Sequence, residues 1–319
     1  MISVTKRTLI CATFLVLAVI MTPMAAMAQA GSYANFEGSQ TNPIRLSADG
    51  TRLFAVNTAN ASLSVFNVTT PSSPTLLAQV PVGLGPVSVN TLNDNLAWVV
   101  NQVSNSISVV APVAGSWNNG GIVTSTIYLK VPLSGGNGTS GGEPMDVVFA
   151  GALAYVSVSR AHAIAVIDTA ALKVTDTWSI APCEEPSGLA FDVAHKRLFA
   201  GCHNKMMVAV DSSNGKAVGN VPIGEGVDAD AFDPATAFAF ASCGDGTITV
   251  AHEDSPDKLS LVDTIHTQRG ARTMALDTSN HNIYTVTADF MPMPAPTPDN
   301  PRPRPSFVPG SFTLLIYTR

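Results

Sequence analysis

The chain has 319 residues, of which 46% are hydrophobic and only 13% are charged, and its formal net charge is −6. Gly (24) and Pro (22) occur near their average frequencies, which excludes a collagen, a low-complexity disordered chain and a highly charged coiled coil. Acidic residues outnumber basic ones by 23 to 17 and no basic stripe is visible, so we expect no nucleic-acid partner. The length suits one large β-domain or two ordinary domains.

Residues 1–28 have the pattern of a secretory signal peptide. Lys6 and Arg7 form a short basic segment, an apolar run follows at residues 8–21, and residues 26–28 (AMA) form a small-x-small cleavage site. The alternative is a transmembrane anchor, but the run is about 14 residues long, too short to cross a bilayer of roughly 30 Å. We therefore expect cleavage after Ala28 and export to the periplasm or the extracellular space, with no membrane span.

Residues 29–319 are expected to form one domain that is built from repeats. The clearest module has two short apolar runs separated by a few polar or small residues, as in Leu53–Asn57 followed by Leu63–Asn67. Turns that end at residues 43, 86, 144, 186, 227 and 271 precede the six copies, so the spacing is 41 to 44 residues except for one interval of 58. No helical period is present. Short strands at this spacing predict an all-β fold, a single β-propeller of six four-stranded blades.

The two ends of the repeat region are expected to complete one blade together. The sixth copy stops at Arg319 after its third strand, and Ser32–Glu37 lies where a fourth strand belongs. Closure of the propeller by this N-terminal strand leaves no open sheet edge. The alternatives are an open solenoid or a two-sheet sandwich, and a count of seven blades if the long second copy contains a degenerate unit.

Two insertions interrupt the repeat. The first, at about residues 111–142, is rich in Gly, Asn and Ser and is expected to form a long flexible loop. The second, at residues 291–310, is rich in Pro and is expected to take an extended path between the second and third strands of the sixth copy. This second insertion is interpreted as a spacer, with a lid or a docking arm as the alternatives.

Two sequence signatures recur in the copies. One is a turn, seen as VPVGLG at residues 80–85 and as VPIGEG at residues 221–226; the other is a strand pair that includes Phe54–Asn57 and, in a later copy, Ile167–Asp168. In these features the chain resembles the YVTN-type β-propeller repeat family of exported bacterial proteins, over roughly residues 32–319. The resemblance implies the fold, but it implies no specific activity because propellers carry many functions.

Charged residues gather in two sets of turns in copies three to six: the turns before the first strand and the turns between the second and third strands. In a propeller both sets emerge on one face, around the channel mouth, and loops on a rigid scaffold often carry function. The candidate ligand-binding residues at this mouth are Glu143, Glu185, His203, Asp228, Asp230, Arg269 and Arg272. The alternative is a solvated loop face that binds nothing.

Four of these residues are carboxylates that could also form a metal site: Glu143, Glu185, Asp228 and Asp230. Oxygen ligands of this kind suit Ca²⁺ or a similar divalent cation, and lactonase-type propellers use such an arrangement. No Asp-x-Asp-x-Asp-Gly loop supports the site. In the alternative, Arg269 and Arg272 pair with carboxylates and no metal is held.

Three cysteines follow the signal peptide: Cys183, Cys202 and Cys243. Export favours a disulfide, and Cys183 and Cys202 fall at the same end of one blade. We predict a Cys183–Cys202 disulfide and a free Cys243, with Cys202–Cys243 as the rival pairing. A copper site at Cys202 and His203 is a weaker alternative.

The motifs favour binding over catalysis. There is no Gly-x-Ser-x-Gly sequence, no phosphate loop and no His-Glu-x-x-His sequence. We expect an exported, monomeric binding or scaffold protein without a cofactor, whose partner is an unidentified protein or small molecule. The alternative is a metal-dependent, lactonase-like hydrolase that holds a divalent cation at the channel mouth.

Overall fold

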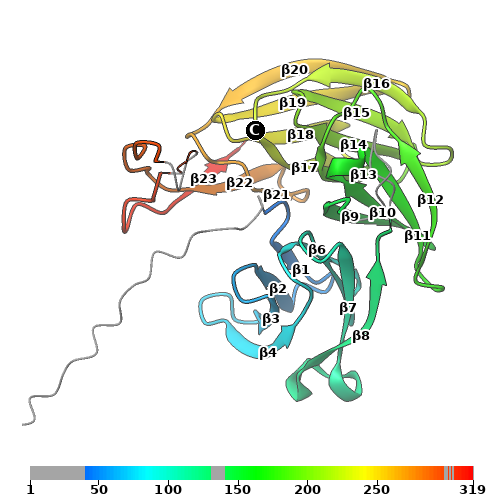
Figure 1. The fold of residues 1–319 in the computed structure, drawn as a ribbon, viewed down its shortest axis with the longest axis vertical. Coiled ribbons are helices and arrows are strands. Elements are labelled where there is room, and N and C mark those ends of the chain that lie inside the picture. Colours follow the sequence, from blue (N-terminus) through cyan, green and yellow to red (C-terminus); the bar gives the residue numbers. More distant parts are fainter. Residues whose placement is uncertain (1–39, 131–140, 298–300, 302, 304, 319) are drawn as a thin grey trace, which may run out of the picture. The chain divides into compact units, whose positions relative to one another are not determined.

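The computed structural model describes residues 40–130, 141–297, 301, 303 and 305–318. The chain divides into two compact units, Met1–Asn35 and Phe36–Arg319, and the described residues belong to the second. That unit is a six-bladed β-propeller, as the repeat predicts (Figure 1). Among the described residues, five sheets have four antiparallel strands and the sixth has three. The expected signal peptide and the closing strand at Ser32–Glu37 lie outside the described residues.

Each sheet is built from consecutive strands, because the turns between them are short enough for antiparallel neighbours to pair. The first three sheets contain, in chain order, β1 (Ile44–Leu46), β2 (Arg52–Asn57), β3 (Ser62–Asn67) and β4 (Thr75–Pro81); β5 (Pro86–Asn93), β6 (Leu96–Asn101), β7 (Ser106–Pro112) and β8 (Gly121–Tyr128); and β9 (Pro144–Ala150), β10 (Leu153–Val158), β11 (Ala163–Asp168) and β12 (Lys173–Ser179).

The remaining sheets follow the same plan. They contain β13 (Pro186–Asp192), β14 (Arg197–Cys202), β15 (Met206–Asp211) and β16 (Ala217–Pro222); β17 (Val227–Asp233), β18 (Phe238–Cys243), β19 (Thr247–Ser255) and β20 (Lys258–His266); and β21 (Met274–Asp277), β22 (Asn282–Thr287) and β23 (Thr313–Tyr317). The first strands of successive sheets contact one another, β1 with β5, β5 with β9, and so on to β21. These first strands are the inner strands of the blades.

The core consists of five apolar clusters, one between each pair of successive sheets. Between the third and fourth sheets, for example, Ile164 packs with Leu198 and Val208. The middle strands are therefore buried on both faces, which explains their continuous apolar sequences, such as the fully buried run Ala97–Val100. Burial between neighbours is what holds each blade in place, since one blade cannot cover its own faces.

Two apolar faces at the ends of the blade series are only partly covered. Ile44 and Leu46 of the first sheet and Leu314 and Ile316 of the sixth sheet are each at least half exposed. Ile44 lies opposite Ala55, and Leu314 lies opposite Val286.

The first insertion differs from its expectation as a single loop. Residues 121–128 form β8, the fourth strand of the second blade, and Ile127 in it is buried. Two short 3-10 turns, η1 (Val113–Gly115) and η2 (Trp117–Asn119), precede this strand. The flexible-loop prediction is therefore wrong for Gly121–Tyr128. The polar content hides the strand because β8 is an outer strand, on which alternate residues face solvent.

The Pro-rich insertion leaves the sixth sheet between β22 and β23, as predicted. At its base Phe290 and Phe307 form an isolated antiparallel bridge, and their ring centroids are 5.1 Å apart. Met291 N donates to the Ser306 carbonyl and Val308 N donates to the Asp289 carbonyl, both at 2.8 Å. The base of this insertion is therefore a short paired stem.

Candidate functional site

The two sets of charged turns meet at one end of the propeller. In the third blade Ser159 N donates to the Glu143 carbonyl at 2.9 Å, and in the fifth blade Gly244 N donates to the Gly226 carbonyl at 2.9 Å. In the fourth blade His203 N donates to the Glu184 carbonyl at 3.0 Å. Each bond joins the turn before an inner strand to the turn between the second and third strands. We refer to this end as the mouth face.

A disulfide fixes the mouth face at the fourth blade. Cys183 and Cys202 are bonded, with their Cα atoms 5.5 Å apart, which confirms the predicted pairing and excludes the rival Cys202–Cys243 pairing. A copper site that uses the Cys202 thiolate is therefore wrong. The bond closes a loop of about 20 residues, worth about 3 kcal/mol in the chain-entropy description. Asn204 adds to the clamp, because its side chain donates to the Pro182 carbonyl at 2.8 Å and accepts from Glu184 N at 3.1 Å.

Among the cysteines that the structure describes, Cys243 is the free one, and it is buried. Burial, with smaller contributions from Asp230 and Asp245, raises the pKa of its thiol to about 12. A thiol with this pKa is protonated at neutral pH and is a poor nucleophile or metal ligand. Cys243 therefore acts as a small apolar side chain.

Glu143 and Glu185 occupy backbone conformations that glycine adopts more easily. Their φ angles are 54° and 50°. The matching residues before the inner strands of the second, fifth and sixth blades are Gly85, Gly226 and Gly270, with φ between 63° and 82°. A residue with a Cβ atom loses roughly 1–2 kcal/mol in this left-handed region. These two glutamates are therefore placed at a conformational cost that three other blades avoid.

The two glutamates differ in what their carboxylates contact. The Glu143 carboxylate lies 3.4 Å from Arg160 Nη1 and accepts from Gln102 Nε2 at 3.4 Å, so it links the second and third blades. Glu185 and its neighbour Glu184 are exposed. Among the described residues, no ion pair within 4.0 Å involves the Glu185 carboxylate. Its carboxylate is therefore available to a ligand.

Asp228 and Arg272 form an ion pair between the fifth and sixth blades. Arg272 Nε lies 2.7 Å from Asp228 Oδ2, and the Asp228 side chain is 1% exposed whereas that of Arg272 is 41% exposed. This pairing agrees with the alternative in which an arginine neutralises a mouth carboxylate. Arg269 is exposed, and its carbonyl accepts from Thr287 Oγ1 at 2.9 Å.

His203 lies on the exposed side of the disulfide-fixed turn, close enough to Glu185 and Arg272 to sense their charges. The pKa of His203 is lowered, first because the surrounding turns restrict its hydration; the Glu185 carboxylate opposes this shift and the Arg272 charge adds to it. At neutral pH the imidazole is therefore uncharged and can both donate and accept a hydrogen bond. The structure thus brings Glu185, His203 and Arg272 into one neighbourhood of the mouth face.

Asp230 does not lie in a mouth turn but in the inner strand β17, opposite Ala241, where it is buried. Its carboxylate accepts a hydrogen bond from Gly201 N of the fourth blade. Among the described residues, no donor reaches its Oδ1 atom. Burial, and secondarily the negative charge of Asp146, raises the pKa of Asp230 well above its usual value.

Asp146 is a buried carboxylate that the sequence analysis did not single out. It accepts from Ser88 Oγ at 2.6 Å, from Leu189 N at 3.1 Å and from Asn42 Nδ2, so it joins four blades. Burial raises its pKa to about 6, against the effect of these hydrogen bonds. Asp146 lies three residues after the strained Glu143, in an inner strand, and inner strands line the channel. This position was the signal in the sequence that could have identified it. The burial of Asp146 and Asp230 makes them internal crosslinks of the propeller.

The four carboxylates of the expected metal site are not gathered into one set of ligands. Within the described ranges, the single group of three or more potential ligands within 4.8 Å consists of Asp192, His195 and Glu253, which lies at the opposite end of the strands. Glu143 and Asp228 are instead paired with arginines. The carboxylates of the mouth face are therefore separate from one another and do not form one set of metal ligands.

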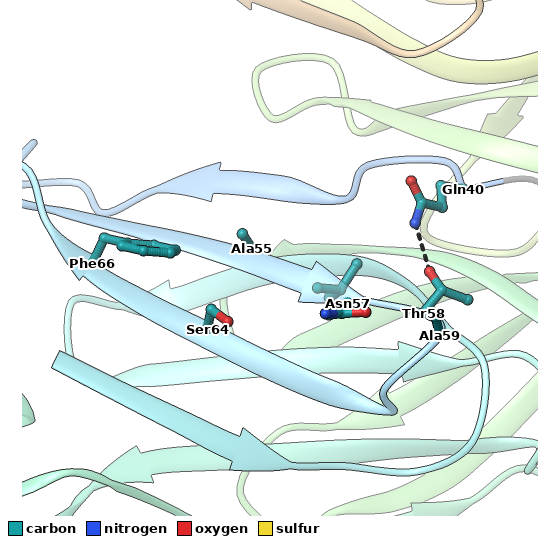
Figure 2. A pocket seen from close by; sticks show the side chains of 8 residues that line it. Gln40, Ala55, Asn57, Thr58, Ala59, Ser64 and Phe66 are labelled. Atoms are coloured by element: carbon teal, nitrogen blue, oxygen red, sulfur yellow. Dashed lines mark hydrogen bonds between the residues drawn. The ribbon is translucent and has the colours of Figure 1, made fainter. Parts of the chain in front are cut away.

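A depression of about 330 Å³ lies beside the first blade (Figure 2). It is lined by Ala55, Asn57, Ser64 and Phe66 together with Gln40, whose Nε2 donates to Thr58 Oγ1 at 2.6 Å (Figure 2). It contains no charged side chain, so it offers no acid, base or strong metal ligand. The depression lies on the partly covered face of the first sheet.

Comparisons with known proteins add information about the fold. No family model matches the chain, and no curated protein matches its sequence. Among solved structures, hydrazine synthase from Kuenenia stuttgartiensis is similar at 19% identity and a TM-score of 0.60, over 78% of this chain and 74% of that one. Two proteins described as "putative 6-phosphogluconolactonase" are also similar, each at 14% identity.

The first of these, from Bacteroides fragilis, has a TM-score of 0.64 over 86% of both chains. The second, from Bacteroides uniformis, has a TM-score of 0.65 over 88% of this chain and 90% of that one. At these identities the likeness shows the propeller fold and does not extend to activity. As to membranes, the described part of the chain contains no helix with the length and apolarity of a membrane span.

Proposed function

We propose that this chain is an exported binding protein that uses Glu185 at the mouth face to hold a ligand with a cationic group. Export is supported by the signal-peptide pattern of residues 1–28 and by the Cys183–Cys202 disulfide, which is typical of an oxidising compartment. The resemblance to exported YVTN-type proteins agrees with this location. The ligand is a small organic cation or the basic side chain of a peptide.

The observation that carries the proposal is the backbone of Glu185. Its φ of 50° imposes a cost that glycine avoids in the same turn of other blades, and its carboxylate is exposed. Strain of this kind is typical of functional positions. Glu143 bears the same strain but uses its carboxylate to link blades, so it has a structural role that Glu185 lacks.

The surroundings of Glu185 suit binding. The disulfide and the Asn204 hydrogen bonds hold the turn rigid, which lowers the entropy lost when a ligand binds. Glu184 adds a second exposed carboxylate, and the uncharged His203 adds a hydrogen-bonding group. Because Arg272 is paired with Asp228, that arginine offsets less of the negative charge of the two glutamates than a free arginine would.

The binding test uses the mature protein and a panel of organic cations: putrescine, spermidine, choline, lysine and arginine. We expect at least one to bind measurably in calorimetry and to raise the melting temperature, and Glu185→Gln to weaken that binding by about tenfold or more. The matched control is Glu225→Gln, because Glu225 is a mouth glutamate that already pairs with Lys205 at 2.8 Å. Equal binding by wild type and Glu185→Gln would reject the proposal.

A hydrolase is the second candidate, and the two Bacteroides proteins favour it through their shared fold and their description. In this case a divalent cation held by the exposed Glu185, with Glu143 and Asp228 released from their arginines, would act on a lactone. The test is acid release from 6-phosphogluconolactone, with and without a chelator. Turnover that is lost in Asp228→Ala and on chelation would replace binding by catalysis as the function.

A further inference from the structure

The group Asp192, His195 and Glu253 lies between the fourth and fifth blades, at the end opposite the mouth face. Asp192 ends β13, His195 lies in the turn that follows, and Glu253 lies near the end of β19. His195 Nδ1 is 2.8 Å from Asp192 Oδ2 and 3.3 Å from Glu253 Oε2. One potential ligand atom from each residue lies within 4.8 Å of the others.

The two carboxylates of this group are buried, and the imidazole is their link to solvent. The Asp192 side chain is 4% exposed and that of Glu253 is 1% exposed, whereas His195 is 50% exposed. The Arg197 guanidinium donates to the His195 carbonyl at 3.0 Å, but its ion pairs are with Asp257 at 2.7 Å and Asp211 at 3.4 Å and not with the carboxylates of this group. One histidine therefore faces two buried negative groups.

Glu253 contributes an acceptor without a donor. In the described part of the chain, nothing donates to its buried Oε1 atom. A buried acceptor that is left unsatisfied costs roughly 1–3 kcal/mol. A bound cation next to the imidazole would satisfy this oxygen and balance the second carboxylate.

The next blade provides an internal comparison. Asp233 ends β17 as Asp192 ends β13, and each of these aspartates accepts from the backbone N of the residue two positions later. Asp233 is satisfied by Thr236 Oγ1 at 2.8 Å and His281 Nδ1 at 2.7 Å, so one carboxylate meets one histidine.

A buried glutamate at this position is not a general feature of the blades. Ser212 in the fourth blade corresponds to Glu253 in the fifth, since each donates its backbone N to the residue before the second strand of its own sheet. An aspartate–histidine contact thus occurs at two blade junctions. Glu253 adds a buried carboxylate to the contact between the fourth and fifth blades.

We propose that Asp192, His195 and Glu253 form a binding site for a divalent first-row metal ion, with Zn²⁺ as the preferred cation. Two carboxylate oxygens and one imidazole nitrogen are donors that Zn²⁺ accepts, and imidazole disfavours Ca²⁺ and Mg²⁺. The exposed side of His195 leaves room for water to complete the coordination. The ion would tie the turn after β13 to the end of β19 and so join two blades.

The experiment uses tag-free mature protein that has been treated with a chelator and dialysed. Titration with ZnCl₂ in a calorimeter should show one bound equivalent, and CoCl₂ should give the visible absorption of a protein-bound cobalt ion. CaCl₂ should bind much more weakly than ZnCl₂. Glu253→Gln and His195→Ala should each weaken Zn²⁺ binding by at least about tenfold.

His281→Ala is the control, because it removes the histidine that contacts Asp233 at the neighbouring junction, and it should leave Zn²⁺ binding unchanged. If Glu253→Gln does not fold, His195→Ala still decides the question because His195 is half exposed. The absence of stoichiometric Zn²⁺ or Co²⁺ binding by the wild type would overturn the proposal. Equal loss of affinity in His281→Ala and His195→Ala would also overturn it.

Discussion

Glu185 and Gly226 occupy the same turn position in consecutive blades, and both have a left-handed backbone, with φ of 50° and 73°. Each residue directly precedes the inner strand of its sheet. The two blades therefore share the backbone conformation of this turn, whereas the residue type at this position differs between them. Because the Glu185 carboxylate makes no ion pair among the described residues, its conformation supports the proposal that the carboxylate binds a ligand.

Replacement of Glu185 by glycine should separate stability from binding. Glycine removes the left-handed strain, which stabilises the folded state, but it also raises the entropy of the unfolded chain, which offsets part of this gain. We therefore expect Glu185→Gly to raise the free energy of unfolding by about 0.5–1 kcal/mol. Binding of the organic cation should be lost. Urea unfolding and calorimetry measure the two effects. Glu143→Gly, which also loses the contacts to Arg160 and Gln102, should gain less stability. A marked loss of stability in Glu185→Gly would mean that the carboxylate is structural.

Gly201 is required by the buried carboxylate of Asp230. A Cβ atom at Gly201 would lie 2.7 Å from both Asp230 carboxylate oxygens. Both groups are buried between blades and have little room to move, so Gly201→Ala should destabilise the protein by about 1–3 kcal/mol. Gly219→Ala is the control, because its Cβ would meet neighbours no closer than 3.5 Å, and it should be neutral within about 0.5 kcal/mol. Equal stabilities for the two variants in urea unfolding would contradict this packing.

The pH dependence of stability should report on Asp146 and Asp230. Aspartate in an unfolded chain titrates near pH 3.9, whereas the pKa of Asp146 in the folded protein is about 6 and that of Asp230 is also well above its usual value. Between these values the folded state keeps protons that the unfolded state has released. The contribution of Asp146 is therefore complete below about pH 4 and is lost as the pH rises through about 6, and that of Asp230 is lost as the pH rises through its own raised pKa.

The measurement is the free energy of unfolding at pH 4.5 and pH 7.5, in the wild type and in Asp146→Asn and Asp230→Asn. Other carboxylates and histidines add their own pH dependence, so the differences between wild type and variants are compared. Each variant should gain stability relative to the wild type as the pH rises. Parallel profiles would show that the two carboxyls titrate normally.

The blade count and the disulfide could be predicted from the sequence, because both depend on the regular spacing of local elements. Cys183 and Cys202 lie at the same end of one blade, so the repeat places them near each other, and the turn before β13 folds back to bring the two sulfurs together. Asp146 could not be recognised, because its partners Ser88 and Leu189 come from other blades. The contact between Asp192 and Glu253 could not be recognised for the same reason, because the two residues come from different blades. Contacts between blades depend on how sheets pack, which a repeat pattern does not encode.

The N-terminal segment should control the stability of the entire propeller. Ile44 and Leu46 at one end of the blade series, and Leu314 and Ile316 at the other, are at least half exposed. Such exposed apolar positions on sheet faces favour a covering strand, and the sequence predicts one at Ser32–Glu37. Replacement of residues 32–37 by a Gly/Ser segment of equal length removes the strand-forming side chains without shortening the chain. We expect a lower melting temperature, because the exposed apolar side chains at the junction between the first and sixth blades would lose the strand that covers them.

The control replaces the exposed residues Ser72 and Ser73, in the turn before β4, by glycine, and it should melt like the wild type. Unchanged melting of the N-terminal variant would show that residues 32–37 do not close the ring.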